Sequence, residues 1–350
     1  MRLVLTLLAR NEADVIDANI SFHLDAGVDF VIATDNRSDD GTTKILEAYE
    51  REGRLRLIRE QGTDMRQGEW VTRMARLAAR EHGADWVIHG DADEFYWPRG
   101  GNLKEVLSVV PDRFGALRTF VRTFLLRPQD DRPFWERMTV RLSAVAPVHD
   151  PASIFRPGSK VIHRGHPDIV LGDGTHALQG APLPALRGYS PIELLHFPFR
   201  TIPQTEAKFV RAWEAWTRNP NRPPPHYYAK AYSAIHDGRI GRFLDSLVVD
   251  DAVLAHGLAD GSLVVDTRVR NALREIGVGN EDSGYRARPA ERLGRLSGPD
   301  LDEEVRYGAE TAALEEADVV RLQRRIDQLE TRVRSLELGA GAHDGDRVPR

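Results

Sequence analysis

Short apolar runs alternate with amphipathic segments along the first 125 residues of the chain. Four of these runs have the length and composition of buried strands, at residues 3–8, 30–33, 55–58 and 86–90. Three segments between them carry apolar side chains at helical spacing, at residues 15–24, 42–51 and 69–80. Gly27 and Gly53 follow two of these segments as helix stops. This rhythm predicts an α/β fold with a mostly parallel sheet flanked by helices.

The pattern changes after a further apolar strand at residues 117–126. From there to about residue 203 it is irregular and rich in Pro, Gly and His, and its aromatic content favours ordered, functional loops. A helix is predicted over 205–216, followed by smaller helices over 226–280 and a polar, linker-like stretch. We therefore expect a first domain over residues 1–215 and a helical C-terminal extension over residues 216–300.

A short heptad seam lies within a helix expected over residues 301–338. Its apolar residues are Val319, Leu322, Ile326, Leu329, Val333 and Leu336. Their 3-4 spacing and charged flanks are compatible with a short coiled coil that joins two copies of the chain. One helix that packs on its own domain fits the pattern equally well. Residues 339–350 are rich in glycine and charge, which predicts a disordered tail.

Composition narrows the class of protein. The formal net charge of −5 argues against a nucleic-acid partner or a membrane-surface partner. The chain has no cysteine, which excludes disulfides, zinc–thiolate sites and thiol nucleophiles and fits a reducing cytoplasm. No apolar run approaches the roughly 20 residues that a membrane helix needs. Residues 3–8 are a better strand than a signal peptide, because charged Arg10 and Glu12 follow directly. We expect a cytoplasmic protein without an integral membrane segment.

Three carboxylates follow the apolar run at residues 86–90, namely Asp91, Asp93 and Glu94. Open α/β sheets bind their ligands at the carboxyl ends of parallel strands. Carboxylates two positions apart on an extended backbone point the same way. We therefore expect Asp91 and Asp93 to face one hard cation or one sugar together. The plainer alternative is a strand that ends in a solvated acidic turn.

Polar loops also follow the first two strands. The first strand runs into Asn11 and Glu12, and the second runs into Asp35 and the polar residues 36–42. An Asx turn and a helix cap account for Ser38, Asp40 and Gly41. We assign Asp35 to a ligand, because a carboxylate at a strand tip can accept from a nucleobase N–H or a ribose hydroxyl.

Taken in order, these motifs resemble the family 2 glycosyltransferases of GT-A type. The residues that carry the resemblance are Asn11-Glu12, then Asp35-Asn36 with Ser38, Asp40, Gly41 and Thr42, then Asp91, Asp93, Glu94 and Phe95. The likeness is to the bacterial branch whose metal motif reads D-x-D-E-F, and it covers about residues 1–215. It implies an inverting transfer of a sugar from a nucleotide-diphosphate donor to an unknown hydroxyl or amine acceptor.

The resemblance also implies Mn²⁺ or Mg²⁺ at the D-x-D motif, where a divalent cation offsets the charge of the departing diphosphate. By similarity, Asp93 ligates the metal, and Asp91 contacts the ribose or reaches the metal directly or through water. A histidine completes the metal shell in related enzymes, and His176 and His196 are equal candidates. An imidazole ligand favours Mn²⁺ over Mg²⁺.

Basic residues are the candidates for binding the nucleotide or its diphosphate, with Glu12 beside them in the first loop. Arg10, Arg66 and Arg73 could form bidentate contacts with phosphate. Arg200 and Lys208 occupy the places where the family carries an arginine and a helical lysine after the histidine.

The sequence does not single out one residue as the catalytic base. Inversion needs a carboxylate within reach of the acceptor hydroxyl, and the Glu-Asp pair that supplies it in many relatives has no convincing counterpart here. The candidates are Glu136, Asp168 and Asp173, and we favour Asp173 because Thr175 and His176 follow it. Glu94 could instead orient its neighbours or reach the acceptor.

Two other functions remain open. A metal-dependent nucleotidyltransferase also uses paired carboxylates, but such enzymes carry a glycine-rich phosphate loop after the first strand, and residues 9–12 contain no glycine. A non-catalytic nucleotide-sugar-binding or scaffold protein would assemble through the heptad seam.

Overall fold

The computed structural model describes residues 1–62, 66–143, 154–155, 158–176, 178–179, 184–186, 190–217 and 228–278, with single positions between 308 and 333. At residues 173, 179, 215 and 216 it describes the backbone alone. Nine strands form the central sheet: β1 (Leu3–Ala9), β2 (Phe30–Asp35), β3 (Leu55–Arg59), β4 (Trp86–Asp91), β5 (Glu94–Pro98), β6 (Ala116–Thr123), β8 (Ser159–Arg164), β11 (Ala185–Leu186) and β12 (Ile192–His196).

The remaining elements surround this sheet. Two small ribbons pair β9 (Val170–Leu171) with β10 (Leu178–Gln179) and β7 (Val140–Leu142) with β13 (Leu263–Val265). The helices in the described residues are α1 (Ile16–Asp25), α2 (Thr42–Arg51), α3 (Gln67–Arg80), α4 (Leu103–Ser108), α5 (Phe134–Arg137), α6 (Ile202–Thr217), α7 (Ala229–His236), α8 (Ile240–Asp245), α9 (Asp251–Ala259) and α10 (Arg268–Ile276), with a 3-10 turn, η1, at Asp173–Thr175.

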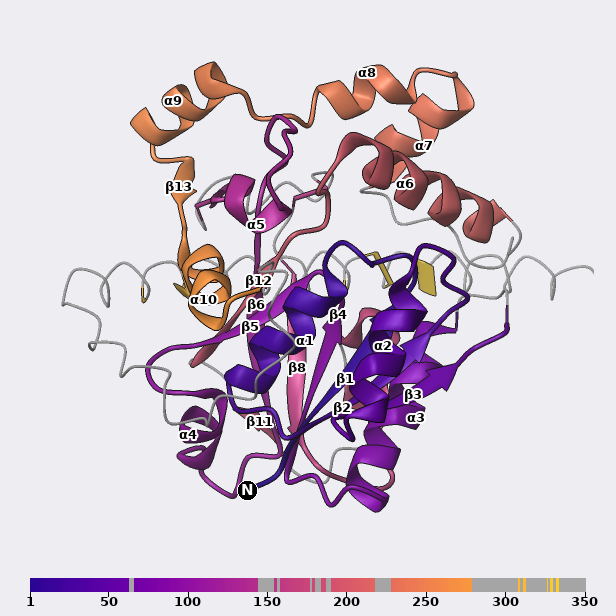
Figure 1. Cartoon of the computed structure of the whole chain (residues 1–350), viewed down its shortest axis with the longest axis vertical. Coiled ribbons are helices and arrows are strands. Elements are labelled where there is room, and N and C mark those ends of the chain that lie inside the picture. Colours follow the sequence, from indigo (N-terminus) through magenta and orange to yellow (C-terminus); the bar gives the residue numbers. More distant parts are fainter. Residues whose placement is uncertain are drawn as a thin grey trace, which may run out of the picture.

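The sheet runs in the order β3-β2-β1-β4-β8-β6-β12-β5, and β11 pairs with β6. β1 lies parallel to β2 and β4, and β2 lies parallel to β3. β8 is antiparallel to both of its neighbours, and β5 is antiparallel to β12. The predicted α/β class, with a mostly parallel sheet flanked by helices, is confirmed (Figure 1).

The strands bury both of their faces. Leu3, Leu5 and Leu7 of β1 belong to one apolar cluster with α1, whereas Val4 between them packs with Met74 of α3 in another. This alternation is the two-residue period of a strand. Helices therefore cover both faces of the sheet, and they leave the carboxyl ends of β1, β2 and β4 on one rim.

Several strands were not expected from the pattern. Of those in the central sheet, β8, β11 and β12 fall in the stretch predicted to be irregular, and β5 follows the acidic turn directly. β8 escaped notice because its sequence, Ser-Lys-Val-Ile-His-Arg, has polar residues at both ends, yet Lys160 and His163 are buried. The strand predicted over 117–126 ends earlier, since β6 stops at Thr123.

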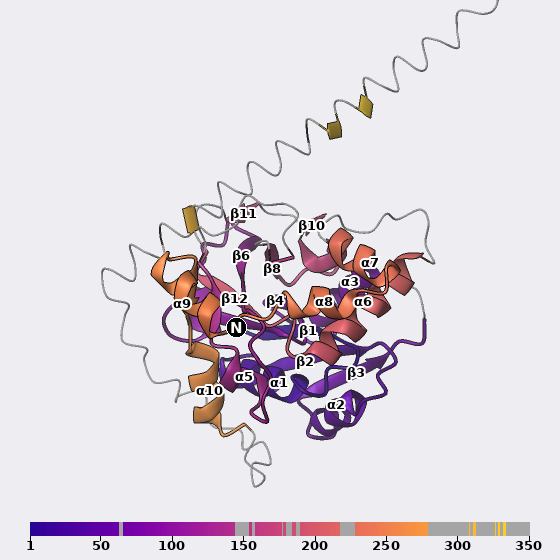
Figure 2. The same ribbon diagram turned by 90° about the horizontal axis from the view of Figure 1, so that it is seen from above.

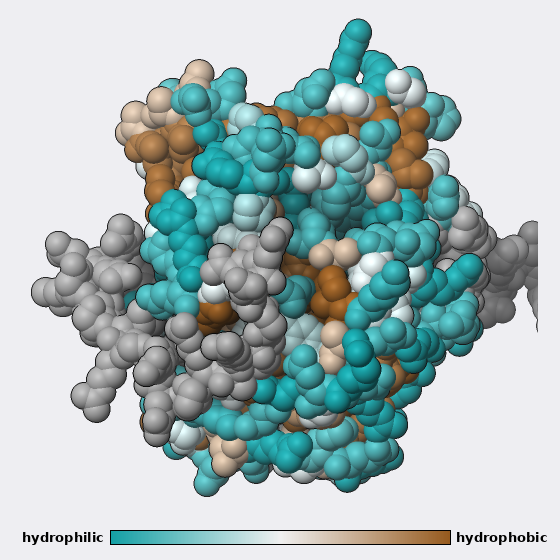
Figure 3. Space-filling model, viewed as in Figure 1, coloured by the Kyte–Doolittle hydropathy of each residue, from teal (hydrophilic) through white to brown (hydrophobic). Residues whose placement is uncertain are grey.

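The C-terminal segments return to the sheet instead of standing apart from it. Helices α6, α7 and α8 share a small apolar cluster, and Figure 2 shows them together on one side of the molecule. Helix α10 places fully buried Leu273 in the main core, and β13 pairs with β7. Helix α9 is exposed, with Val253 50% and Leu258 44% accessible, and brown atoms lie over it in Figure 3.

Of the predicted heptad seam, three positions are described. Ile326, Leu329 and Val333 are helical, and 47%, 47% and 52% of their surfaces are exposed. The other seam residues lie outside the described residues, as do the polar linker and the predicted tail over 339–350. Within the described part of the chain, no helix is long and apolar enough to cross a membrane.

Candidate active site

The loops after β1 and β2 are tied to each other. Asn11 adopts a left-handed conformation with φ 57°, which Asn tolerates better than most residues. Its backbone N–H donates to the Ser38 hydroxyl at 3.0 Å, and its side-chain oxygen accepts from the Asp39 N–H at 2.9 Å. These contacts hold the two loops as one fixed part of the rim.

Asp35 lies at the tip of β2 as predicted, but its oxygens are engaged inside its own loop. It is 4% exposed, and it accepts from the Ser38 N–H at 3.1 Å, the Ser38 hydroxyl at 2.6 Å and the Thr43 hydroxyl at 2.5 Å. In this arrangement Asp35 shapes the loop that leads into α2. Its contact with a nucleotide stays a prediction.

The acidic strand end is divided by a turn. β4 ends at Asp91, residues 92 and 93 form a turn, and β5 begins at Glu94. The expectation that Asp91 and Asp93 lie on one extended backbone is therefore wrong. The chain must leave β4 here because β5 pairs with β12 at the far edge of the sheet. The two aspartates consequently have different partners.

Asp91 and Glu94 share the buried lysine of β8. The Lys160 ammonium donates to Asp91 at 3.0 Å and to Glu94 at 2.5 Å. Glu94 also accepts from the backbone N–H of Asp91 at 2.9 Å, and Gln67 at the start of α3 donates to Asp91 at 3.4 Å. Glu94 is thus buried and fully engaged, whereas the Asp91 side chain is 37% exposed.

Asp93 lies among basic side chains that come from β12, from α6 and from the segment between them. Its Oδ1 is 3.4 Å from His196 Nε2, and its Oδ2 accepts from the Lys208 ammonium at 2.7 Å. Arg200 Nη1 lies 3.6 Å from the same Oδ2. The Asp93 side chain is 2% exposed, while His196 is 23% and Lys208 30% exposed. The carboxylate is therefore buried, whereas His196 and Lys208 are partly exposed to solvent.

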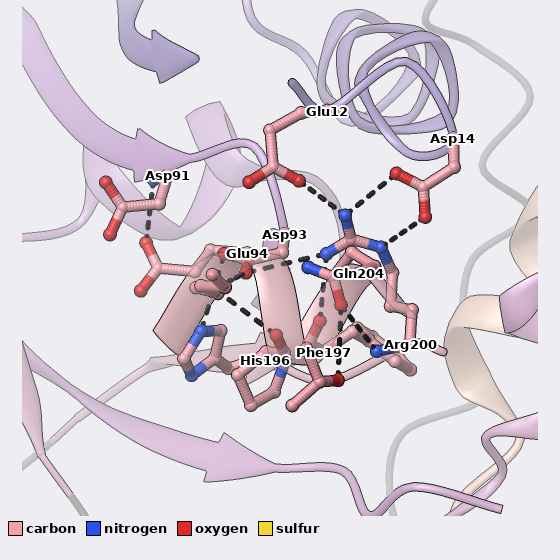
Figure 4. Close-up of polar contacts among 12 residues, drawn as sticks. Glu12, Asp14, Asp91, Asp93, Glu94, His196, Phe197, Arg200 and Gln204 are labelled. Carbon is pink, nitrogen blue, oxygen red and sulfur yellow. Dashed lines mark hydrogen bonds and ion pairs between the residues drawn. The ribbon is translucent and has the colours of Figure 1, made fainter. Parts of the chain in front are cut away.

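Arg200 links the first loop to this cluster (Figure 4). Its guanidinium is fully buried, donates to Glu12, and binds Asp14 through two hydrogen bonds of 2.6 and 2.8 Å. Its backbone N–H donates to Gln204 at 3.1 Å. Arg200 thus fixes the rim after β1 against the segment that follows β12.

The electrostatics follow from burial and from these neighbours. Burial acts to raise the pKa of Asp93, but Lys208, His196 and Arg200 outweigh it and hold that pKa well below its ordinary value. For Glu12 the balance is reversed, because burial raises its pKa more than Arg200 lowers it. The pKa of Glu94 is likewise raised by burial, despite Lys160. Burial therefore favours the neutral forms of Glu12 and Glu94, whereas the basic neighbours of Asp93 keep that carboxylate charged.

Several predicted residues lie away from this cluster or are occupied elsewhere. Arg66, just before α3, pairs with Glu69 at 3.7 Å, and Arg73, in the middle of α3, pairs with Glu60 at 3.1 Å. Arg10 is exposed on the rim. These arginines stay candidates for a nucleotide.

The structure shows the side-chain partners of two candidate bases and only the backbone of the third. Glu136 accepts two hydrogen bonds from Arg274, and this partner lowers its pKa. Asp168 is 74% exposed and pairs with Arg80 at 3.2 Å. Asp173 begins η1, and its side chain lies outside the described residues.

The two candidate histidines occupy different places. His196 contacts Asp93, as described above. His176 follows η1, is exposed, and bonds through Nδ1 to the Ser159 carbonyl at 2.6 Å. It flanks the Lys160 side of the rim, since Ser159 directly precedes Lys160 in β8.

Sequence reasoning missed two charged residues of this cluster, Lys160 and Asp14. Lys160 is a single lysine in an irregular-looking stretch, and nothing in its local sequence marks it. Asp14 lies two positions after Glu12, so a polar rim loop with three acidic or amide positions could have drawn attention to it.

A divalent cation fits the donor set at Asp93. Among the described residues, no group of three or more His, Asp or Glu side chains is arranged to bind a metal. Mg²⁺ and Mn²⁺ in phosphate-transfer sites, however, need only one or two protein ligands, because phosphates supply the others. Asp93 and His196 offer a carboxylate oxygen and an imidazole nitrogen 3.4 Å apart.

Comparison with models of known protein families gave no match, and comparison with curated protein sequences gave none either. Solved structures gave partial similarities. S. aureus TarS 1–349 is 12% identical over 65% of this chain and 68% of its own, with a TM-score of 0.33. The same fragment with UDP-GlcNAc is 13% identical over 61% and 67%, with a TM-score of 0.35.

A third similar structure is glucosyl-3-phosphoglycerate synthase from Mycobacterium tuberculosis with Mn²⁺, UDP and glucosyl-3-phosphoglycerate. It is 21% identical over 35% of this chain and 44% of its own, with a TM-score of 0.26. At TM-scores this low the likeness decides neither the family nor the activity of this chain.

Proposed function

We propose that the chain is a glycosyltransferase of GT-A type, which moves a sugar from a nucleotide-diphosphate donor to a hydroxyl or amine with inversion. The observation that carries the proposal is the position of Asp93 at the ligand-binding rim of the sheet. It is buried there among His196, Lys208 and Arg200. The order of the motifs after β1, β2 and β4 supports the same function.

The arrangement suits departure of a diphosphate. A divalent metal bound by Asp93 and His196, with Asp91 beside them, would supply Lewis-acid stabilisation of the leaving group. Lys208 is 30% exposed and carries a positive charge at the same place, so its ammonium can bind a phosphate oxygen. Buried Arg200 holds the loop of Glu12 in position. Asp173 stays our candidate for the base.

The experiment is donor turnover with Mn²⁺ and a panel of nucleotide sugars that includes UDP-GlcNAc and UDP-glucose. We expect hydrolysis or transfer with at least one donor, and a loss of about a hundredfold in kcat for Asp93→Asn. Asp39→Asn, an exposed aspartate of the same rim, is the matched control. Binding of no donor, or normal turnover by Asp93→Asn, would refute the proposal.

We also propose that the chain self-associates through residues 319–336. The half-exposed apolar surfaces of Ile326, Leu329 and Val333 favour it, because a helix packed on its own domain would cover them. A scaffold without catalysis would keep this assembly and bind no donor, so the donor experiment also separates the two functions.

A further inference from the structure

Arg37, in the loop that follows β2, has a backbone conformation that suits glycine better than arginine. Its φ is 57°, in the left-handed region. Among the described residues other than glycine, only Asn11, Arg37 and Thr175 have a positive φ. A side chain with a Cβ atom is disfavoured in this region, and glycine or asparagine is the usual occupant. The chain therefore carries an arginine where a glycine would be less strained.

The hydrogen bonds around Arg37 fix this conformation. Asp35 accepts from the Ser38 N–H at 3.1 Å and from the Ser38 hydroxyl at 2.6 Å, which closes the turn that contains Arg37. Asn11 in turn accepts from the Asp39 N–H at 2.9 Å. These bonds restrain the residues on both sides of Arg37, so its φ cannot relax unless the turn opens.

The guanidinium of Arg37 is not used by the fold. The side chain is exposed, and it makes no hydrogen bond, ion pair or ring contact with the rest of the described chain. Two carboxylates close to it in sequence have other partners. Asp35 binds within the turn, and Asp40 accepts from the Thr42 hydroxyl at 2.6 Å and from the Ala13 N–H at 3.0 Å. The guanidinium is therefore available to a ligand.

The place of Arg37 on the rim limits what that ligand can be. β1 lies between β2 and β4. Neighbouring strands are about 4.8 Å apart, so the loop after β2 is about 10 Å from the acidic turn after β4. In the proposed function the diphosphate leaves at that turn, and Asp35 is assigned to the nucleoside. The part of the donor that can reach Arg37 is therefore the nucleobase.

We propose that Arg37 stacks on the nucleobase of the donor, a contact that accounts for an arginine at a position suited to glycine. A guanidinium is planar and weakly hydrated, and it stacks on flat rings, including bases. Every base offers such a face, so Arg37 adds affinity for the nucleoside without choosing between bases. The inference rests on the proposed function, and it adds a binding residue that lies outside the acidic turn.

The test is calorimetric titration of the whole chain with UDP, GDP, ADP, CDP and dTDP in the presence of Mn²⁺. Pyrophosphate serves as the probe that has no nucleoside. We expect Arg37→Gly to weaken binding of the preferred nucleotide about three- to tenfold, and binding of pyrophosphate by less than about twofold. Arg37→Lys keeps the charge but not the plane, so it should show most of the same loss.

Stability supplies an independent measurement. Arg37→Gly relieves the left-handed strain, so its Tm should rise by about 1–2 °C while its nucleotide affinity falls. Most losses of a binding residue's partner contacts would not raise Tm, which makes the combination diagnostic. Lys44→Gln, an exposed lysine at the start of α2, is the control and should match the wild type in both measurements.

The outcomes separate the inference from the function on which it rests. Wild-type nucleotide affinity in Arg37→Gly would overturn the inference and leave the proposed function standing. An equal loss for pyrophosphate, or full binding by Arg37→Lys, would show that the charge of Arg37 meets a phosphate, and a lower Tm would show that Arg37 stabilises its own loop; each result overturns the inference. If the wild type binds none of the nucleotides, the proposed function fails and the inference fails with it.

Discussion

At the scale of single residues, burial sets the chemistry of this protein. The sequence identifies Asp93 as a carboxylate that follows a strand. Its low pKa, however, comes from Lys208, His196 and Arg200, which lie more than a hundred positions later in the chain. Lys160 shows the same dependence, because only its neighbours Asp91 and Glu94 make a buried lysine tolerable.

His23 provides a test of pH dependence at this scale. It is fully buried, its Nδ1 bonds to the Asn19 carbonyl at 2.8 Å, and its Nε2 accepts from the Tyr96 N–H at 3.1 Å. Burial lowers the pKa of His23 from 6.5 to about 4. As pH falls from 6.5 to about 4, His23 therefore becomes protonated in the unfolded chain while it stays neutral in the folded protein. The stabilisation is complete above pH 6.5 and is lost on acidification.

We expect the free energy of unfolding to fall by up to about 3 kcal/mol per such histidine between neutral pH and pH 4. Denaturant unfolding at several pH values measures this. The slope should be shallower in His23→Gln than in the wild type, and unchanged in His236→Gln, where the histidine is 77% exposed. Equal slopes in all three proteins would contradict the assignment.

At the scale of elements, ion pairs attach α10 to the sheet. Arg268 at its start donates to Glu193 of β12 at 2.5 Å and to Asp266 at 2.6 and 2.9 Å. Glu193 is 4% exposed and also accepts from Arg122 at 2.9 Å. These charges lie next to the apolar contacts of Leu273 and decide where the helix docks.

Arg268→Ala tests this attachment. Removing the guanidinium leaves two buried carboxylates with fewer cations, so we expect a loss of about 2–4 kcal/mol in the free energy of unfolding. Arg270→Ala on the same helix is the control, since Arg270 bonds to Asn271 of its own helix at 3.3 Å. Equal stability of the two variants, measured by denaturant unfolding, would show that the ion pairs do not hold α10.

The heptad seam carries a second prediction at this scale. Val, Ile and Val occupy the a positions of the heptads, and leucines occupy the d positions. This pattern favours a coiled coil of two parallel helices. In a parallel pair, the arginines at the g positions of one helix face the glutamates at the e positions of the other. These pairs are Arg325 with Glu330 and Arg332 with Glu337. An antiparallel pair of helices would place like charges together.

We expect Leu329→Asp to convert a dimer into a monomer in light scattering coupled to gel filtration. Gln328→Asp, one position away and off the seam, should leave the dimer intact. Metal binding should persist in both variants, because the site lies in residues 12–208. A wild type that is monomeric at high concentration would rule out assembly through the seam.

At the scale of the whole molecule, the C-terminal segment packs against the N-terminal part of the fold. Residues 263–276 follow the outer helices, yet they return to pair with β7 and to pack on α1 and α5. The central sheet and the C-terminal segment therefore share one core, which the local pattern of hydrophobic residues does not reveal.

Two truncations test whether residues 263–276 are part of the core. A chain that ends at residue 262 loses Leu263, Val269 and Leu273, which are 8%, 2% and 0% exposed. We expect it to be destabilised by about 5 kcal/mol or more, because each buried aliphatic side chain contributes about 2–5 kcal/mol. A chain that ends at residue 278 keeps all three and should unfold at a clearly higher temperature in calorimetry. Equal Tm values would contradict a shared core.

The sequence by itself determined the strands and helices over residues 3–91 and the acidic loops on their rim. Strong local periodicity and turn residues specify such elements, and parallel strands bring their ends together without further information. Only the tertiary structure decided the rest. β8 joins the sheet because burial and pairing outweigh its polar sequence, and it delivers Lys160 to Asp91. The turn at residues 92–93 separates Asp91 from Asp93, because β5 must reach β12. Contacts between residues far apart in the chain set these features, and no local pattern encodes them.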